Sequence, residues 1–427
     1  MRPIALAFLC LLALLVPIAS QAQDGVSPIE RRAAQVVGLM RGDTNADALE
    51  ELFTPTFLGA ITPEQLTALF AQLRSLYGEA QRVESVTPPG ATRAALAIRM
   101  DRAIVRGGIA IDPAQGGRVS ELLFQSFQPL PSATAGAIEA ELAALPGTVT
   151  AYFGPLDAGP PRLSHNPDVQ NALGSTMKLY LLAQLGREVA QGKRAWSDVA
   201  ALSTRSFPSG MMQDWPEGAP VTLHKLASLM ISISDNTATD ILTRVLGQEA
   251  IADMVRRSGH ADPALNAPWL TTRELFLLKG GERSRMRAYL RGSAQERARI
   301  LAGIERPPVS VDDVNAAFAK GPVALGIEWF ASPRDLAGLL RTMRAESDPQ
   351  VFEIMAINES FPAEMREQWR YVGYKGGSEP GVLNLTWLLT DRQGRDHILT
   401  LGWSNPEAPV DEARLEALAW RILAERG

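Results

Sequence analysis

The stretch that decides the fold of this chain is Gly174-Ser175-Thr176-Met177-Lys178, which opens the apolar run Leu179 to Leu185. On a helix, Ser175 and Lys178 stand three positions apart and therefore share a face. A serine hydroxyl is a weak nucleophile unless a base lies within reach, and a lysine whose pKa is lowered by burial can be that base. A helix N-terminus also stabilises a developing oxyanion. Taken alone, the same residues also fit a serine N-cap followed by a surface lysine.

A second polar segment, Ser234-Asp235-Asn236, ends the apolar helix predicted from Leu223 to Ile233. Residues that end a helix and begin a loop can point their side chains into a cleft. A serine there can relay a proton to a leaving group, and an asparagine can hold a substrate amide. By itself the segment also fits a polar cap before the next helix.

A third segment, Tyr374-Lys375-Gly376-Gly377-Ser378, lies at the end of a predicted strand. Its lysine could bind a substrate carboxylate, and its glycines would let a substrate lie close to the strand edge. A hairpin turn with a solvated lysine is the alternative interpretation of this segment by itself.

In this order the three segments resemble the motif set of the active-site serine penicillin-recognising enzymes, and especially of class A β-lactamases. The similarity extends through residues 209–238 and covers roughly residues 133–427. It implies a β-lactamase/transpeptidase-like domain, an antiparallel sheet covered by helices with a mostly helical middle. Strands predicted at both ends of this region, with helices between them, agree with one sheet assembled from both ends.

The resemblance also implies which residues perform the chemistry. Ser175 resembles the nucleophile, Lys178 the base that activates it, and Ser234 the proton shuttle to the leaving nitrogen. The backbone N–H groups of Ser175 and Ser378 match the oxyanion hole of the family.

Substrate-binding positions are implied in the same way. Asn236 resembles the residue that orients the side-chain amide of the substrate, and Lys375 resembles the partner of its carboxylate. Gly377 and Ser378 complete the predicted binding edge.

Two positions depart from the family pattern. The third motif usually carries a hydroxyl residue where this chain has Gly376, so a carboxylate contact is missing unless Ser378 supplies it. The family releases its acyl-enzyme with a water activated by an Ω-loop glutamate, and the nearest match here is the shorter Asp262, in Asp262-Pro263-Ala264-Leu265-Asn266. Asp262 is therefore a possible deacylation base, and a cap or a plain loop acid is the alternative.

The family resemblance predicts an enzyme that hydrolyses β-lactams through an acyl-enzyme on Ser175. One alternative is an esterase or a D-alanyl-D-alanine peptidase on the same scaffold, with slow or no β-lactam turnover. Another is a non-enzymatic binding protein, although a binder has no need of the Ser175, Lys178 and Ser234 set. The expected partner is a small β-lactam or an acyl or peptide-like molecule.

The preceding region, residues 23–130, is predicted to be a separate α+β domain. Apolar spacing indicates helices at residues 29–40, 48–58 and 62–76, and strands follow at 92–100, 103–111 and 122–130. This order of helices and then a meander resembles the nuclear-transport-factor-2 (NTF2) and steroid-isomerase folds. Residues 129–132 are expected to be the linker.

Residues 1–22 have the features of a secretory signal peptide, which predicts a periplasmic or secreted protein without stable membrane insertion. Arg2 precedes the apolar stretch Ile4 to Ile18, and Ser20-Gln21-Ala22 places small residues at a cleavage site. A retained anchor is the alternative. The single cysteine, Cys10, lies inside this stretch, so the mature chain would have no disulfide and no thiolate metal site.

Net charge and the placing of the histidines argue against nucleic-acid binding and against a metal site. The chain has 427 residues, of which 46% are hydrophobic, and its net charge of −5 is too mild to indicate nucleic acid as a partner. The four histidines stand singly, so no metal site and no cofactor are expected. They are His165, His224, His260 and His397.

Overall fold

The structure is a computed structural model that describes residues 26–42, 45–131, 136–157, 159–207, 209–305 and 308–424. The predicted signal peptide, the last residue of the predicted linker (residue 132) and residues 133–135 of the predicted second domain lie outside the described residues. The chain divides into two compact units, the first within residues 26–126 and the second formed chiefly by residues 127–424. Each unit is described by itself.

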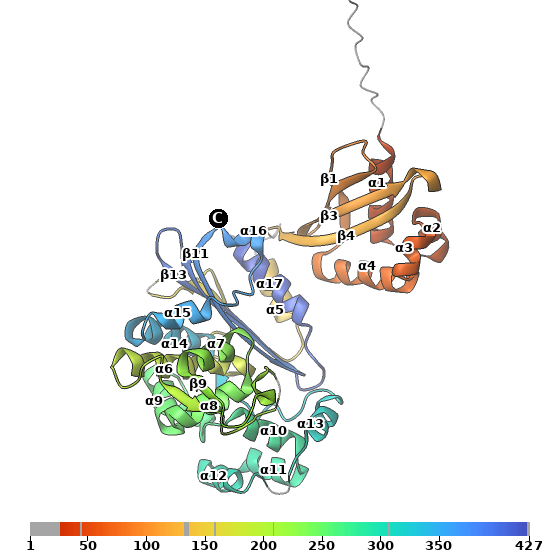
Figure 1. Ribbon diagram of the computed structural model, residues 1–427. Coiled ribbons are helices and arrows are strands. Elements are labelled where there is room, and N and C mark those ends of the chain that lie inside the picture. Colours follow the sequence, from red (N-terminus) through yellow and green to blue (C-terminus); the bar gives the residue numbers. More distant parts are fainter. Residues whose placement is uncertain are drawn as a thin grey trace, which may run out of the picture. The chain divides into compact units, whose positions relative to one another are not determined.

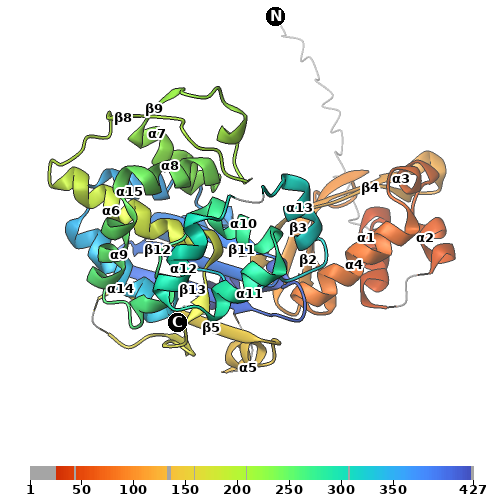
Figure 2. The ribbon, with the colours of Figure 1, turned by 90° about the horizontal axis from the view of Figure 1, so that it is seen from below.

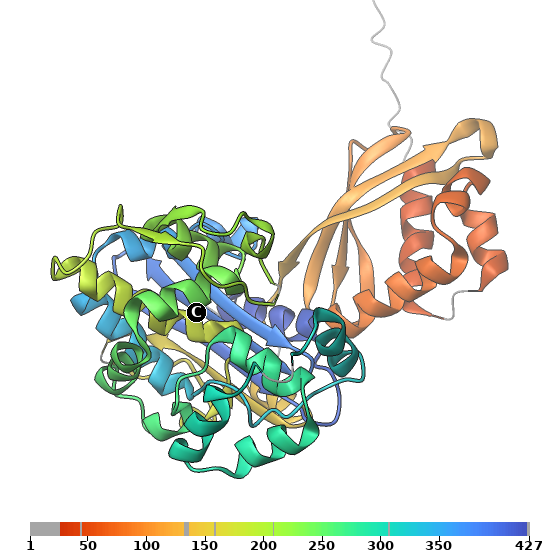
Figure 3. The same ribbon diagram turned by 60° about the horizontal axis from the view of Figure 1, so that its bottom comes forward.

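The first unit is a four-stranded antiparallel meander with helices on one face (Figure 3). Its helices are α1 (Pro28–Arg41), α2 (Ala46–Leu52), α3 (Pro55–Ala60) and α4 (Pro63–Tyr77). Its strands are β1 (Ala80–Thr87), β2 (Arg93–Met100), β3 (Ala103–Asp112) and β4 (Arg118–Pro129). The first strand, β1, is not among the elements predicted from the sequence.

One predicted helix of this unit is divided in two. Residues 48–58 form α2 and α3 because Pro55 has no N–H to continue a helical ladder. Thr54 caps the new helix by accepting a hydrogen bond from the Phe57 N–H at 3.2 Å, and Phe53 leaves the helix to bridge to Val119.

The second unit is built around a five-stranded antiparallel sheet with the order β11-β12-β13-β5-β6 (Figure 1). The chain enters this sheet through β5 (Thr148–Pro155) and β6 (Leu163–His165), and returns through β11 (Trp369–Glu379), β12 (Val382–Asp391) and β13 (Asp396–Ser404). β13 pairs with β5, which joins the two ends of the domain. This confirms the sheet predicted from both ends of the region.

Helices cover both faces of this sheet (Figure 2). One face carries α5 (Ala137–Ala143) and α17 (Glu412–Ala424), which are joined by the ion pair between Arg421 and Glu141 at 2.8 Å. The other face packs against the larger apolar core. The helices of the long middle region are α6 (Lys178–Ala190), α7 (Leu223–Ser232), α8 (Asn236–Leu246), α9 (Gln248–Arg257), α10 (Thr272–Gly280), α11 (Arg283–Arg291), α12 (Ala294–Ala302), α13 (Val311–Phe318), α14 (Pro333–Glu346), α15 (Gln350–Met355) and α16 (Ala363–Arg366).

Short elements complete the second unit. They are the strands β7 (Asn171–Ala172), β8 (Val199–Ala201), β9 (Pro220–Thr222) and β10 (Phe330–Ala331), and the single-turn 3-10 helices η2 (Gly174–Met177), η3 (Met212–Asp214) and η4 (Pro263–Asn266). β10 pairs with β7, which fixes the chain directly before η2. Among the helices that the described residues form, none is long and apolar enough to cross a membrane.

Candidate active site

Lys178 is the first residue of α6 and is fully buried. Its Nζ donates hydrogen bonds to Asn236 Oδ1 at 2.8 Å, to Ser234 Oγ at 3.0 Å and to the Ser234 carbonyl at 2.7 Å. Burial, and secondarily the nearby ammonium of Lys375, hold the pKa of Lys178 well below its usual range. A lowered pKa makes it easier for Lys178 to lose a proton and become the neutral amine, which is the form that a catalytic base requires.

Ser175 lies in η2, directly before α6, and this turn rests against the backbone of β11. A Cβ added at Gly377 would lie 2.2 Å from the Leu173 carbonyl oxygen and 2.3 Å from the Ser175 nitrogen. Only glycine permits this approach. Gly377 therefore lets the edge of β11 lie against the turn that carries Ser175.

Ser234 and Asn236 lie where α7 ends and α8 begins, as the sequence predicts. Ser234 has a φ of 57°, a left-handed conformation that non-glycine residues adopt uncommonly. Asp235 between them caps α8 by accepting from the Ala238 N–H at 2.8 Å. Asn236 also donates to the Phe207 carbonyl at 3.0 Å, so its amide is held at both ends.

Lys375 lies on β11 and is only 4% exposed. Burial lowers the pKa of its ammonium to about 7. Ser378, three positions along the same strand, is exposed at the rim of the same cavity. The strand thus offers a buried cation and an exposed hydroxyl along one edge.

Two cavities meet at Ser175, and both are also lined by Ser209 and Ser378. The larger, of about 410 Å³, follows the edge of β11 and also contains Ser234 and Lys375. The smaller, of about 140 Å³, extends behind η2. Besides the three shared serines, it is lined by Gly174, Asn236, Thr272, Leu275, Phe276, Glu328, Trp329 and Glu379. The structure therefore places Ser175, Ser234, Asn236, Lys375, Gly377 and Ser378 around connected spaces.

Asp262 is not brought to this group. It is exposed at the start of η4 and makes no side-chain cap bond to that turn. It lines neither of the two cavities that contain Ser175. Because η4 packs beside α9, Asp262 is placed as a loop acid and not as a base beside the nucleophile.

The space beside Gly376, where the family usually has a hydroxyl residue, is occupied by the hydroxyl of Tyr374. A Cβ added at Gly376 would lie 2.0 Å from the hydroxyl of Tyr374. Tyr374 packs its ring against Trp387, with centroids 4.8 Å apart, and lines the larger cavity. A hydroxyl is therefore present at this point of the strand, although it comes from two residues earlier.

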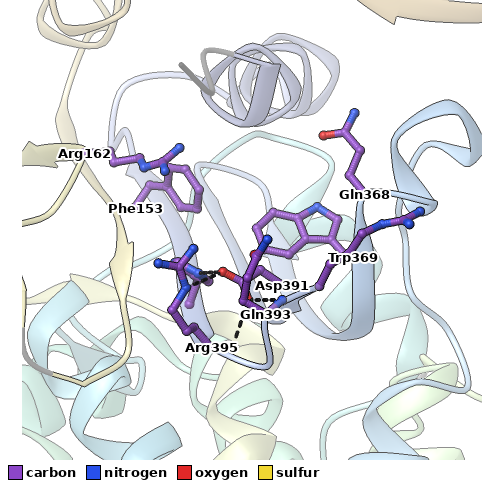
Figure 4. A pocket seen from close by; sticks show the side chains of 9 residues that line it. Phe153, Arg162, Gln368, Trp369, Asp391, Gln393 and Arg395 are labelled. Carbon is purple, nitrogen blue, oxygen red and sulfur yellow. Dashed lines mark hydrogen bonds and ion pairs between the residues drawn. The ribbon is translucent and has the colours of Figure 1, made fainter.

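A further cavity, of about 380 Å³, has a different lining and shares no residue with the two at Ser175 (Figure 4). At its base Asp391 accepts from Arg395 Nε at 2.8 Å and is paired with His397 at 3.1 Å. Within the described ranges, no group of three or more histidine, cysteine, aspartate or glutamate side chains could hold a metal ion.

A comparison with known protein families covers the region that contains Ser175, Lys178 and β11. Residues 133–419 match the model of the Beta-lactamase enzyme family, Beta-lactamase2. The chain belongs to this β-lactamase family. The match confirms the family and the fold class expected from the motifs. The NTF2 resemblance of residues 23–130 stays a prediction, because the match begins at residue 133. No curated protein matches the chain.

This β-lactamase family member is also similar to solved structures. With the β-lactamase from Sphaerobacter thermophilus DSM 20745 it shares 21% identity and a TM-score of 0.46, over 68% of this chain and 94% of that one. With the putative class A β-lactamase PenP from Rhodopseudomonas palustris the values are 17% and 0.47, over 68% and 97%. With a mutant of PBP-A, in an acyl-enzyme complex with penicillin G, they are 17% and 0.46, over 67% and 93%.

Several residues of this family member that line the cavities were not singled out from the sequence. Ser209 donates to the Ser234 carbonyl at 2.7 Å, and its position inside the family-like stretch 209–238 was the available signal. Glu379 directly follows Ser378 at the end of β11, where a charged residue would enter the cleft. Glu328 gave no such signal, because only the folded chain brings it to the site, whereas Tyr374 stands in the third polar segment but its residue type alone predicts no role there.

Proposed function

We propose that this protein is a serine hydrolase that opens β-lactams by forming an acyl-enzyme on Ser175. The observation that carries the proposal is the fully buried Lys178, bonded to Ser234 and Asn236 beside the turn that holds Ser175. A buried amine with a depressed pKa is the base that a serine nucleophile needs.

In the acylation step, Ser175 Oγ attacks the carbonyl carbon of the substrate and Lys178 Nζ takes the hydroxyl proton. The C–N bond of the lactam then breaks. Its nitrogen receives a proton from Ser234 Oγ, which Lys178 replenishes across their 3.0 Å hydrogen bond. The backbone N–H groups of Ser175 and Ser378 are the proposed donors to the oxyanion.

The larger cavity is the proposed place where the substrate binds and is oriented. Lys375 is its buried cation and supplies the charge for a substrate carboxylate. The hydroxyls of Ser378 and Tyr374 lie on the same strand and can donate to the same anion.

A reporter β-lactam tests the proposal through intact mass and turnover. The native protein should gain the mass of the opened lactam, and Ser175→Ala should gain none, because the attacking oxygen is absent. The matched control is Ser203→Ala, which removes a serine hydroxyl that lines neither cavity at Ser175. An adduct that persists in Ser175→Ala would refute the assignment, and no adduct on the native protein would favour a binding role.

A second candidate is hydrolysis of an ester or a D-alanyl-D-alanine-type peptide on the same scaffold. It is favoured by Glu412 and Glu416 of α17, which line the larger cavity opposite the strand edge. Two carboxylates there suit a substrate that carries an amine as well as a carboxylate. Turnover of such a peptide or ester, with a β-lactam adduct that persists, would select this candidate.

We also propose that the protein is exported, on the basis of residues 1–22 alone. The mature chain would then begin near Gln23. N-terminal sequencing of periplasmic protein gives a direct answer, and a chain that still begins at Met1 would contradict export with cleavage.

A further inference from the structure

Three charged side chains meet inside the second unit, next to the smaller cavity. Lys279 of α10 lies with its Nζ 2.5 Å from Glu379 Oε1 and 3.4 Å from Glu328 Oε1. The side chains of Lys279 and Glu328 are 0% and 1% exposed, and that of Glu379 is 10% exposed. Glu379 is thus the member of the cluster that opens most to its surroundings.

The two glutamates have different surroundings. Glu328 Oε2 accepts hydrogen bonds from the Gly174 and Trp329 N–H groups, both at 3.2 Å, so its charge is stabilised by backbone donors. Its bond to Gly174 also anchors the turn that carries Ser175. For Glu379, burial raises the pKa of the carboxyl, and the neighbouring Glu328 raises it further against the opposing effect of Lys279.

When its three side chains are all ionised, the cluster carries a net negative charge and can bind one proton. Two carboxylates face a single ammonium, so the fully ionised cluster carries an uncompensated negative charge in a buried position. Taking up one proton removes that charge, which is why a buried like-charged pair binds a proton more readily than an isolated carboxylate. In the ionised cluster Glu379 is the carboxylate that would accept that proton, because Glu328 is already committed to two backbone donors.

The cavity beside Glu379 can hold a water molecule. It measures about 140 Å³ and is lined by Ser175, Asn236 and Ser209 as well as by Glu379. A water occupies about 30 Å³ and needs two to four polar partners, and this lining supplies them. The cavity therefore joins a proton acceptor to the residue that would carry the acyl group.

We propose that Glu379 is the general base that activates the hydrolytic water for release of the Ser175 acyl group. The assignment rests on the proposed acyl-enzyme. The water oxygen attacks the ester carbonyl carbon while its proton passes to Glu379. The bond between that carbon and Ser175 Oγ then breaks, and the proton returns to Ser175 Oγ, so the enzyme is restored. Glu328 and Lys279 are positioning residues in this step, and Asp262 has no part in it.

Glu379→Gln tests the assignment in pre-steady-state kinetics with a penicillin, followed by intact mass. Glutamine keeps the shape of the side chain and cannot accept the proton. Acylation should stay within about threefold of the native rate, whereas deacylation should fall about a hundredfold or more. The acyl-enzyme should therefore accumulate. Asp262→Asn is the matched control, because it neutralises the exposed loop acid, and both of its rates should equal those of the native protein.

Each outcome decides a separate point. A native deacylation rate in Glu379→Gln, or a defect that appears in Asp262→Asn instead, would overturn the assignment while the acyl-enzyme stands. A native protein that acylates with no penicillin would overturn the proposed β-lactam chemistry itself. Should Glu379→Gln fail to fold, as judged by thermal melting, the pH profile of native deacylation decides. A rate that rises with pH through one ionisation supports a carboxylate base, and a flat profile between about pH 5 and pH 9 contradicts it.

Discussion

The two sides of Ser175 are built from the sequence in different ways. On the side proposed to carry out acylation, Lys178, Ser234 and Asn236 come from compact motifs at helix ends, and their polar atoms meet within 3.0 Å. On the side of the smaller cavity, Lys279 is separated along the chain from Glu328 by 49 residues and from Glu379 by 100. The comparison teaches that short local motifs can bring together the groups proposed to activate Ser175. The groups around the smaller cavity, where the hydrolytic water is proposed to bind, are brought together only by long-range packing.

Lys178→Met is expected to give the largest effect on the acylating side. It removes the base but leaves an unbranched side chain of similar length, so acylation should slow by about 10² to 10⁴. Stopped-flow measurement with a reporter β-lactam follows this step directly. Lys225→Met, at an exposed position of α7, is the matched control and should acylate at the native rate. Near-native acylation in Lys178→Met would show that activation does not depend on the compact motif.

Gly377→Ala and Gly376→Ala compare two adjacent positions of β11. The new Cβ at 377 would meet backbone atoms of the nucleophile turn at 2.2 to 2.6 Å, whereas at 376 the nearest atom is the Tyr374 hydroxyl at the end of a side chain. A displacement of about 1 Å can cost on the order of a hundredfold in rate. Gly377→Ala should therefore lose about that factor in acylation and Gly376→Ala much less. Equal losses would show that the turn does not rest on residue 377.

The pH dependence of substrate binding should reveal the charge on Lys375. Its pKa of about 7 means that the ammonium is present at lower pH and is lost as the pH rises above 7. The KM for a β-lactam with a free carboxylate should therefore rise by up to about tenfold per pH unit above 7, and stay level below it. A substrate whose carboxyl is esterified is the control and should show no such rise. The same rise with the esterified substrate would assign the effect to another group.

Tyr374→Phe should give the smallest effect. It removes the hydroxyl beside Gly376 and keeps the ring that packs against Trp387. One hydrogen bond typically contributes a net stabilisation of about 0.5 to 1.5 kcal/mol, so KM should rise about two- to tenfold, with kcat unchanged. The double variant Gly376→Ser with Tyr374→Phe should recover part of the loss, since it returns a hydroxyl to the vacated space. Unaltered KM in Tyr374→Phe would show that the hydroxyl does not face the substrate.

The sequence by itself determined the fold class of residues 133–427 and predicted the residues that the structure gathers around Ser175. Both follow from local rules. Periodic apolar runs define the helices and strands, and short polar motifs at their ends project side chains into a shared cleft. The sheet assembled from both ends of the domain was predictable because strand patterns stand at both ends of the region and helical patterns lie between them. The prediction of one helix over residues 48–58 was wrong. The apolar spacing is continuous through this stretch and favours a single helix, although Pro55 is the residue at which the structure begins a new one.

Only the tertiary structure decided which carboxylate lies beside Ser175. A matching Leu-Asn pattern pointed to Asp262, but the folded chain leaves that residue exposed and brings Glu379 and Glu328 to the cavity instead. In the same way, the Tyr374 hydroxyl occupies the space above Gly376. The pKa values of Lys178 and Lys375 are likewise set by burial in the assembled core. The physical reason is common to all of these: desolvation and proximity are produced by residues far apart in the chain, and no local spacing encodes them.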